Sequence, residues 1–363
     1  MRPAPKGAAG VMLGLLLAVL GACTATPAPE PVPTDDRVGR SQATIEAVVG
    51  SDEVPGCSAA VGNDGEVVWQ GVRGVAVEEP ATPITPDTTF DIGSVSKQFT
   101  ALAVATLADR GRLSLDDVVA EHLDGYPPWA EKVTLSQLIH HTGGVPDMDG
   151  LAVAAGVSGE MELSFDDVLQ VIKEGATALE FEPGSRWAYT DTGYLLLAAI
   201  VEDVTHQPLA EYLQQTFFAP LDLTMTVGPP LQDPTRTRSY RAGANGRFEI
   251  IDTNADLRGA SGIRATPTEL VGWADNYRTG TVGGQLVTAP ESTAVSGGFE
   301  DSRYGFGILI SPDLTLWHSG DTGGFHTAFG VSADRAWALA VACNSVGLDP
   351  WTIFEPLGEI WGP

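Results

Sequence analysis

The feature that most constrains the fold is that strand-like segments lie at both ends of one globular stretch, with helical patterns between them. Residues 57–76, CSAAVGNDGEVVWQGVRGVA, suit a β-hairpin with its turn at Asn63-Asp64-Gly65. From Tyr304 onward the sequence follows a period-two strand pattern, and a last helical segment at 350–361 closes the chain. This order predicts an α+β fold, in which N- and C-terminal strands complete one antiparallel sheet flanked by helices.

The middle of the chain is mostly helical in pattern. Three segments, at 164–175, 192–205 and 209–218, have helical apolar spacing and are separated by loops rich in Gly and Pro. We therefore expect a mostly helical lobe at about 100–270, inserted into one domain that covers 38–363. A cleft between lobe and sheet is the default place for a functional site.

The first 22 residues have the pattern of an export signal. Arg2 and Lys6 precede the apolar run VMLGLLLAVL, which is short for a membrane-spanning helix. The letters LGAC resemble a bacterial lipoprotein box, which implies cleavage before Cys23 and lipidation of its thiol. The Pro-rich residues 23–37 then form an extended tether. The sequence thus predicts an exported, membrane-anchored lipoprotein of the bacterial cell envelope, with plain secretion as the alternative.

Charge and cysteine content limit the partners. The formal charge of −27 argues against binding of nucleic acid or of an anionic membrane surface, because both require a basic face. Cys57 and Cys343 remain as an even pair in strand-like segments, and either a disulfide or two buried thiols is compatible with the pattern. The three cysteines and six histidines show no metal-type spacing, so we expect no metal and no cofactor.

A helix expected from about Ser94 to Gly111 carries Lys97 in its first turn. A cation there opposes the helix macrodipole, so Ser94 is either a simple cap or a nucleophile with its base one turn away. Side chains three apart on a helix face the same way, and the helix N-terminus offers N–H groups to an oxyanion. Among the four lysines of the chain, Lys97 alone has a serine three residues before it.

Three short motifs follow one another along the chain: Ser94-Val-Ser-Lys97, Tyr189-Thr-Asp191 and His318-Ser-Gly320. This order resembles that of the penicillin-recognising serine hydrolases related to class C β-lactamases, which carry Ser-x-x-Lys, Tyr-x-Asn and Lys/His-x-Gly. The family includes D-alanyl-D-alanine peptidases, D-aminopeptidases and carboxylesterases. Further blocks between about 41 and 346 are similar to family blocks at matching places: LIHHTGGVPD, FEPGSRWAYTDTGYLLLAAIVE, PLDLTMT, GASGIRATPTEL and YGFGI.

The resemblance implies a function for each motif residue. Ser94 would be the acylated nucleophile, Lys97 its base partner, and Tyr189 the hydroxyl that moves protons between nucleophile and leaving group. The N–H of Ser94 and one from the strand after Gly320 would form the oxyanion hole. The resemblance also places His318 in the catalytic set, and it places Asp191, Ser319 and Gly320 in the substrate-binding set.

Two departures from the family pattern bear on function. Asp191 stands where Asn is usual, and a carboxylate only accepts hydrogen bonds and would favour the ammonium form of Lys97. Three interpretations remain open: Tyr189 takes over more of the base function, Asp191 binds an amine of the substrate, or the site is weak or inactive. His318 replaces a permanent cation by a group with a reference pKa of about 6.5, which weakens recognition of a penicillin-type carboxylate.

The sequence therefore predicts a serine hydrolase that works through an acyl-enzyme on a small ester, amide or peptide, with weak or no β-lactamase activity. The alternative is a catalytically weak binding or sensing lipoprotein. A second triplet of the His-x-Gly type, HTG, begins at His141, which we expect to be a buried, hydrogen-bonded histidine that shapes its loop.

Overall fold

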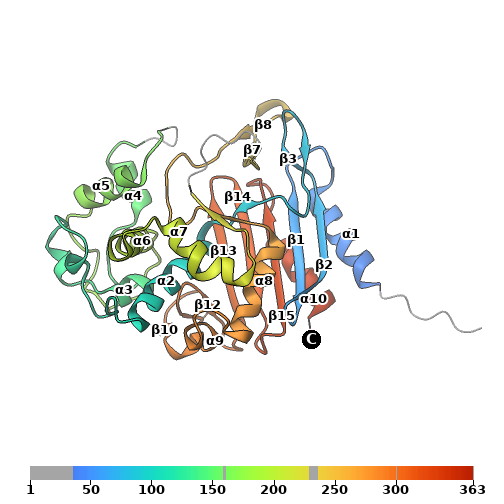
Figure 1. The fold of residues 1–363 in the computed structure, drawn as a ribbon. Helices are drawn as coiled ribbons and strands as arrows, with labels where there is room; N and C mark the ends of the chain where they lie inside the picture. The colour runs from blue at the N-terminus through green and yellow to red at the C-terminus, as the bar shows by residue number, and fades with distance from the viewer. Residues whose placement is uncertain (1–35, 158–160, 229–235, 300, 363) are drawn as a thin grey trace, which may run out of the picture. The chain divides into compact units, whose positions relative to one another are not determined.

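The centre of the fold is an eight-stranded antiparallel sheet, seen in the computed structural model of Figure 1. Strand β1 lies between β15 and β2, so the first strands of the chain complete the sheet of the last ones. The predicted α+β fold is confirmed. In spatial order the strands are β10 (Val295–Ser296), β11 (Arg303–Tyr304), β12 (Leu309–Ile310), β13 (Leu316–Thr322), β14 (Phe325–Val331), β15 (Trp337–Cys343), β1 (Cys57–Asn63) and β2 (Glu66–Arg73).

The structure describes residues 36–157, 161–228, 236–299 and 301–362. Residues 37–363 make up one unit, and the account below concerns that unit. The predicted signal peptide at 1–22 and the predicted lipidation site at Cys23 lie outside the described residues. Within the described ranges, none of the helices is both long and apolar enough to cross a bilayer.

Helices cover both faces of the sheet (Figure 1). On one face, α1 (Arg37–Val49) and α10 (Trp351–Trp361) bury Ile45 and Ile353 against β1 and β15. On the other face lies α8 (Pro267–Thr279), packed so closely that a Cβ on Gly62 of β1 would stand 2.2 Å from a methyl carbon of Val271. The central strands β1 and β15 are therefore buried at almost every residue.

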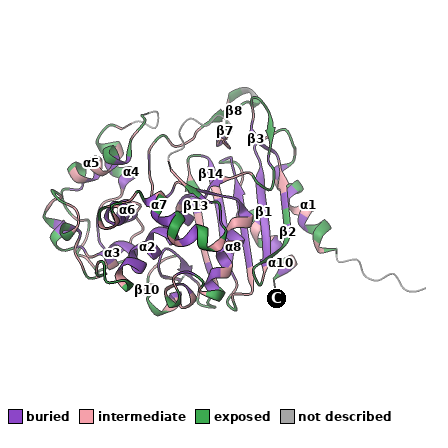
Figure 2. Ribbon diagram, viewed as in Figure 1, coloured by how far each residue is buried: buried purple, intermediate pink, exposed green. Residues whose placement is uncertain are grey.

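The helical lobe packs around α2 (Lys97–Asp109) and α6 (Thr192–Thr205), which are buried over most of their length (Figure 2). Helix α6 is buried at every residue from Thr192 to Val201, as expected for a helix that is apolar on all sides. Further described α-helices are α3 (Leu135–Ile139), α4 (Met148–Ala154), α5 (Phe165–Gly175), α7 (Leu209–Leu213) and α9 (Gln285–Thr288). A π turn at Gln214–Phe218 follows α7.

Short strands connect lobe and sheet. In one small sheet, β9 (Ile263–Ala265) lies between β5 (Phe90–Asp91) and β6 (Thr226–Val227). The pairing of β5 with β9 fixes the chain just before Ser94 against a segment that is distant in sequence. The remaining strands pair as β3 (Val75–Val77) with β4 (Thr82–Pro83) and as β7 (Tyr240–Ala242) with β8 (Phe248–Ile250).

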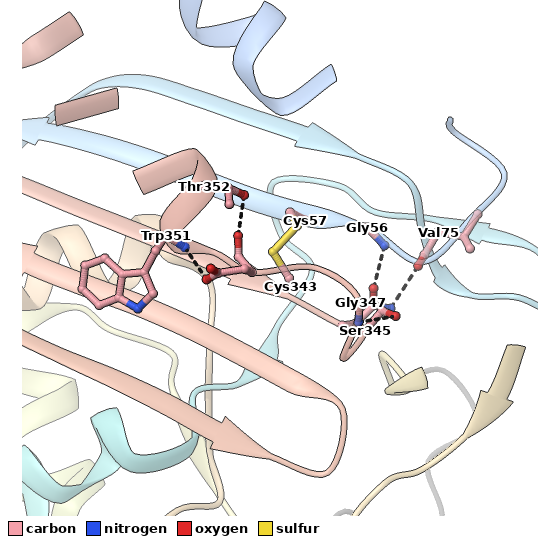
Figure 3. Close-up of a disulfide and its surroundings, with 10 residues drawn as sticks. Gly56, Cys57, Val75, Cys343, Ser345, Gly347, Trp351 and Thr352 are labelled. Atoms are coloured by element: carbon pink, nitrogen blue, oxygen red, sulfur yellow. Dashed lines mark hydrogen bonds between the residues drawn. A yellow bond between two sulfur atoms is a disulfide. The ribbon is translucent and has the colours of Figure 1, made fainter. Parts of the chain in front are cut away.

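A disulfide joins Cys57 of β1 to Cys343 of β15, and so resolves the alternative that the sequence left open (Figure 3). The two residues face each other across the strand pair with their Cα atoms 4.1 Å apart. Next to it, the Asn344 amide accepts a hydrogen bond from Gly56 N at 2.7 Å and donates one to Val75 O at 3.0 Å. The two ends of the domain are therefore held together covalently and by buried polar contacts.

One expected strand is interrupted. The period-two pattern that starts at Tyr304 predicts a continuous strand here, but β11 ends at Tyr304 and β12 begins at Leu309. Between them Gly307 has a φ of +70°, and a Cβ there would stand 2.5 Å from the carbonyl carbon of Lys97. The chain leaves the sheet at this point because it packs directly on the first residue of α2.

Candidate active site

Ser94 lies on a short 3₁₀ turn, Gly93–Ser96, that precedes α2. The helix predicted from about Ser94 in fact begins at Lys97. Neither Ile92, which precedes the 3₁₀ turn, nor Ser96, which precedes α2, makes a side-chain cap. Gly93 has a φ of +53°, and a Cβ there would stand 2.6 Å from Asp321 N, so this position requires glycine. The turn leaves Ser94 partly exposed while its neighbours are buried.

Lys97 is fully buried and its ammonium group makes three hydrogen bonds. Nζ donates to Ser94 Oγ at 2.9 Å, to Asp191 Oδ1 at 2.6 Å and to the carbonyl oxygen of Ala260 at 3.0 Å. Ser94 is not the cap of α2, because the cap position is Ser96, and the Ser94 hydroxyl accepts from Lys97. An ammonium has three N–H donors, and all three are satisfied here.

The charge of Lys97 depends on Asp191. Burial by itself would lower the pKa of Lys97, but the attraction of the Asp191 carboxylate, assisted by Tyr189, outweighs it and raises that pKa above its usual value. The Asp191 side chain is 32% exposed, whereas the Lys97 side chain is not exposed at all. In the resting site Lys97 is thus an ammonium, as expected if a carboxylate replaces the usual amide.

Tyr189 lies over Lys97, with Nζ 4.9 Å from the centre of its ring. Its hydroxyl is buried and makes no hydrogen bond of good geometry within the described part of the chain. Burial raises the pKa of Tyr189, and the opposite effect of Lys97 is smaller. The hydroxyl therefore keeps its proton at neutral pH and lies next to Ser94 and Lys97.

His318 on β13 is buried, and both of its ring nitrogens have protein partners. Because the Ser319 carbonyl can only accept, Nδ1 is the donor to it, at 2.6 Å. Nε2 then accepts from the Tyr304 hydroxyl at 3.1 Å. Burial lowers the pKa of His318 to about 4, so this side chain is neutral at pH 7 and presents no cation.

Strand β13 brings its backbone, at Gly320, against the 3₁₀ turn that carries Ser94. A Cβ at this position would stand 1.9 Å from the carbonyl oxygen of Ile92 and 3.1 Å from Ser94 N. Side chains alternate along β13, so Ser319 lies on the opposite face together with Trp317, which packs on Trp351 of α10. The structure thus places Gly320 next to Ser94, whereas the Ser319 side chain lies on the other face of β13.

The segment before α6 is held by the loop at 140–147. Asp147 Oδ2 accepts hydrogen bonds from Asp191 N and from Thr190 Oγ1, each at 2.8 Å. His141 Nδ1 accepts from Thr190 N at 3.3 Å, and its backbone oxygen accepts from Ala188 N at 2.9 Å. The expectation for His141 is confirmed: it is 1% exposed, burial lowers its pKa well below the usual value, and it shapes the loop.

Three contributors to the site were not identified from the sequence. Asp147 lies in the block LIHHTGGVPD and Tyr304 in YGFGI, so their surroundings were noticed but their side chains were given no function. The third, the carbonyl oxygen of Ala260, is a backbone group, and no residue type signals it. The structure brings together Ser94, Lys97, Tyr189, Asp191, His318 and Gly320, which is an arrangement suited to acyl transfer to a serine hydroxyl.

The depressed pKa of His318 predicts a pH effect on stability. Between pH 6.5 and 4 the unfolded chain binds a proton that the folded chain does not, so folding stability falls as the pH falls through this range. The loss assignable to His318 amounts to about 3 kcal/mol at most. Denaturant unfolding at several pH values should show a smaller slope of stability against pH for His318→Gln than for the native chain. Part of the slope should remain, because buried His141 acts in the same direction. Equal slopes would contradict the assignment.

Comparisons with known proteins agree with this geometry. The Beta-lactamase family model matches residues 42–352. The chain is 30% identical over 243 residues to a putative D-alanyl-D-alanine carboxypeptidase of Escherichia coli O157:H7, covering 60% of this chain and 54% of that protein. The matches span about half or less of the length of the curated relatives.

Solved structures show the same fold. The octameric penicillin-binding protein homologue from Pyrococcus abyssi superposes with a TM-score of 0.78 at 26% identity, covering 90% of this chain and 77% of that one. The D-amino acid amidase from Ochrobactrum anthropi SV3 superposes with a TM-score of 0.74 at 21% identity, covering 90% and 97%, which is a likeness of fold alone. Since the family model covers most of the sequence, the chain belongs to the β-lactamase-like family of serine hydrolases, together with penicillin-binding proteins and D-alanyl-D-alanine carboxypeptidases.

Proposed function

We propose that this protein hydrolyses small esters, amides or peptides through an acyl-enzyme on Ser94, and that it hydrolyses β-lactams poorly. The observation that carries the proposal is the hydrogen bond of 2.9 Å between Lys97 Nζ and the Oγ of a partly exposed serine. A serine hydroxyl becomes a nucleophile when a base removes its proton, and this nitrogen is within reach of that proton.

The reaction follows from these contacts. In the fraction of molecules whose Lys97 has lost a proton, the amine still donates to Asp191 and Ala260, and its lone pair faces Ser94 Oγ. Oγ then forms a bond to the substrate carbonyl carbon, its proton moves to Lys97, and the carbonyl oxygen takes the negative charge. When the bond to the leaving group breaks, the leaving group takes the Tyr189 hydroxyl proton, which Lys97 replaces. In deacylation, water attacks the acyl carbon and gives up a proton to the same groups. The bond to Ser94 Oγ then breaks, Oγ takes a proton back, and the acid is released.

The developing oxyanion would be stabilised by backbone N–H groups. The close approach of Gly320 to Ser94 N supports an oxyanion hole made by the N–H of Ser94 and that of Asp321. Both groups belong to rigid elements, the 3₁₀ turn and β13, so they require no rearrangement when charge forms.

The charge of the site supports the choice of substrate. Lys97 is compensated by Asp191, and His318 is neutral and buried, so neither offers a free cation to a substrate carboxylate. A penicillin carries such a carboxylate, whereas a simple ester or an amino-acid amide does not.

The test uses the chain without residues 1–23, a fluorophosphonate probe, a chromogenic short-chain ester and a penicillin. We expect labelling and ester turnover, both abolished in Ser94→Ala, and much slower penicillin hydrolysis. Intact mass identifies the labelled species. Efficient penicillin hydrolysis would refute the proposed substrate class, and an unlabelled native protein would refute the nucleophile.

Asp191 should control the pH dependence of Ser94 reactivity. Because its carboxylate raises the pKa of Lys97, Asp191→Asn should lower that pKa and leave more free amine at neutral pH. The rise of the labelling rate with pH should therefore move to lower pH, by about one to three units. The measurement is the second-order rate constant for fluorophosphonate labelling between pH 5 and 10.

Asp149→Asn is the matched control, because Asp149 interacts with the charge of Lys97 without a hydrogen bond to it. Its profile should move less than that of Asp191→Asn. If Asp191→Asn is instead slower than the native chain at every pH and its pH profile does not move, the carboxylate serves the substrate and does not restrain Lys97.

The ion pair between Lys97 and Asp191 favours a second candidate, a binding or sensing protein that acylates and turns over slowly. Such a protein would still be labelled at Ser94. The rate of deacylation separates the two candidates: an esterase regains its free serine on the timescale of turnover, whereas a sensor keeps the acyl group.

We further propose that the protein is exported and anchored in the bacterial envelope by a lipid at Cys23, on the sequence pattern of residues 1–23. Expression of the full chain in bacteria fed a labelled fatty acid should give a labelled protein in the membrane fraction. Cys23→Ser should remove the label. Label that persists in this variant would overturn the assignment.

A further inference from the structure

Asp91 is a buried carboxylate that the steps above do not use. It is the last residue of β5, it lies three positions before Ser94, and it is 4% exposed. Burial raises the pKa of its carboxyl group, and the attraction of Arg264 acts against that rise. A carboxyl group in such surroundings is expensive to bury, so its hydrogen bonds indicate what it holds in place.

One oxygen of Asp91 binds two backbone amides from separate parts of the chain. Oδ1 accepts from Gly93 N at 3.0 Å and from Gly262 N at 3.3 Å. Gly93 is the residue directly before Ser94. Gly262 follows Ala260 by two residues, and the Ala260 carbonyl oxygen accepts one of the three hydrogen bonds of Lys97.

We propose that Asp91 is a positioning residue for the acylation of Ser94, an inference that rests on the proposed function. Through one oxygen it fixes both the turn that carries Ser94 and the segment that carries Ala260 O. These two groups are also partners of Lys97 Nζ. Asp91 thus sets the distance over which the proton of Ser94 must pass, although it touches none of the reacting atoms.

The other hydrogen bonds in this region do not replace those of Asp91. Ile92 N donates to Ile263 O at 2.9 Å, and Ile263 N donates to Ser96 Oγ at 3.3 Å, so the turn and β9 are also joined on either side of Ser94. Neither bond reaches Gly93, which has a left-handed φ and the conformational freedom of a glycine. Among the described residues, the Asp91 carboxylate is the group that constrains this amide.

The experiment compares Asp91→Ala, which removes the acceptor, with Asp91→Asn, whose amide oxygen can still accept both hydrogen bonds. Fluorophosphonate labelling of the chain without residues 1–23 is measured over a range of probe concentrations. Asp91→Ala should lower the maximal labelling rate constant by about 10- to 100-fold with little change in the apparent affinity for the probe, because misplacement of reacting groups acts on the chemical step. Asp91→Asn should stay within about threefold of the native chain.

Asp117→Ala is the control variant. Asp117 also accepts a backbone hydrogen bond, from Ser114 N at 2.8 Å, and it lies outside the site. It should lower thermal stability and leave labelling unchanged. If Asp91 had only a structural function, Asp91→Ala would likewise lose stability and keep its labelling rate. Native labelling rates in folded Asp91→Ala would therefore overturn the proposal.

Folding of each variant is followed by circular dichroism. If Asp91→Ala does not fold, Asp91→Asn still decides: a loss of more than about tenfold in the folded protein would overturn the acceptor function, and retention of the rate supports it. Failure of the native chain to be labelled would instead refute the proposed hydrolase. The two failures are therefore distinguishable.

Discussion

The site depends on the burial of one ammonium group. Transfer of a charge from water into a protein interior costs several kcal/mol unless partners replace its hydration. Lys97 is fully buried, and its partners come from three segments: the 3₁₀ turn with Ser94, the start of α6 with Asp191, and the loop with Ala260. These segments must converge on one nitrogen for the fold to tolerate it, so the same requirement that stabilises the interior also brings Ser94 and Asp191 to Lys97.

Each of the three segments is itself fixed by a further polar contact. Asp147 binds the amide of Asp191, Asp91 binds the amides of Gly93 and Gly262, and Thr100 of α2 donates to the carbonyl oxygen of Gly259 at 2.8 Å. The groups around Lys97 are therefore held by neighbours that are not among the hydrogen-bond partners of its ammonium. Such an arrangement suits a site whose geometry must not change when the ammonium loses its proton.

The sequence predicted regular helices and strands well, and it predicted individual tertiary contacts poorly. Apolar periodicity located the hairpin of β1 and β2 and the buried helix α6, because burial of one face leaves a regular pattern. It did not show that 304–311 breaks into two strands, because that break comes from contact between Gly307 and the backbone of Lys97. Pairing of Cys57 with Cys343 also stayed open, since it depends on the register between β1 and β15.

Motif order located Ser94, Lys97, Tyr189, Asp191, His318 and Gly320, but it did not show on which face of β13 Ser319 lies. That face follows from strand alternation and from the position of α10, which are tertiary facts. Asp91 and Ala260 O were missed for a related reason: one acts on backbone amides and the other is a backbone oxygen. Groups that act through the main chain leave no signature in residue type, and they are found only when the chain is folded.

The pairing of Lys97 with Asp191 also changes what the site can attract. An amide at position 191 would leave the charge of Lys97 uncompensated, and a basic residue at position 318 would add a second positive charge. Here a carboxylate balances Lys97, and His318 is neutral with both nitrogens engaged. A substrate carboxylate would therefore meet a neutral site with a partly exposed carboxylate at its edge. On the proposed function, the carboxylate that protects the buried ammonium also makes an uncharged substrate the better fit.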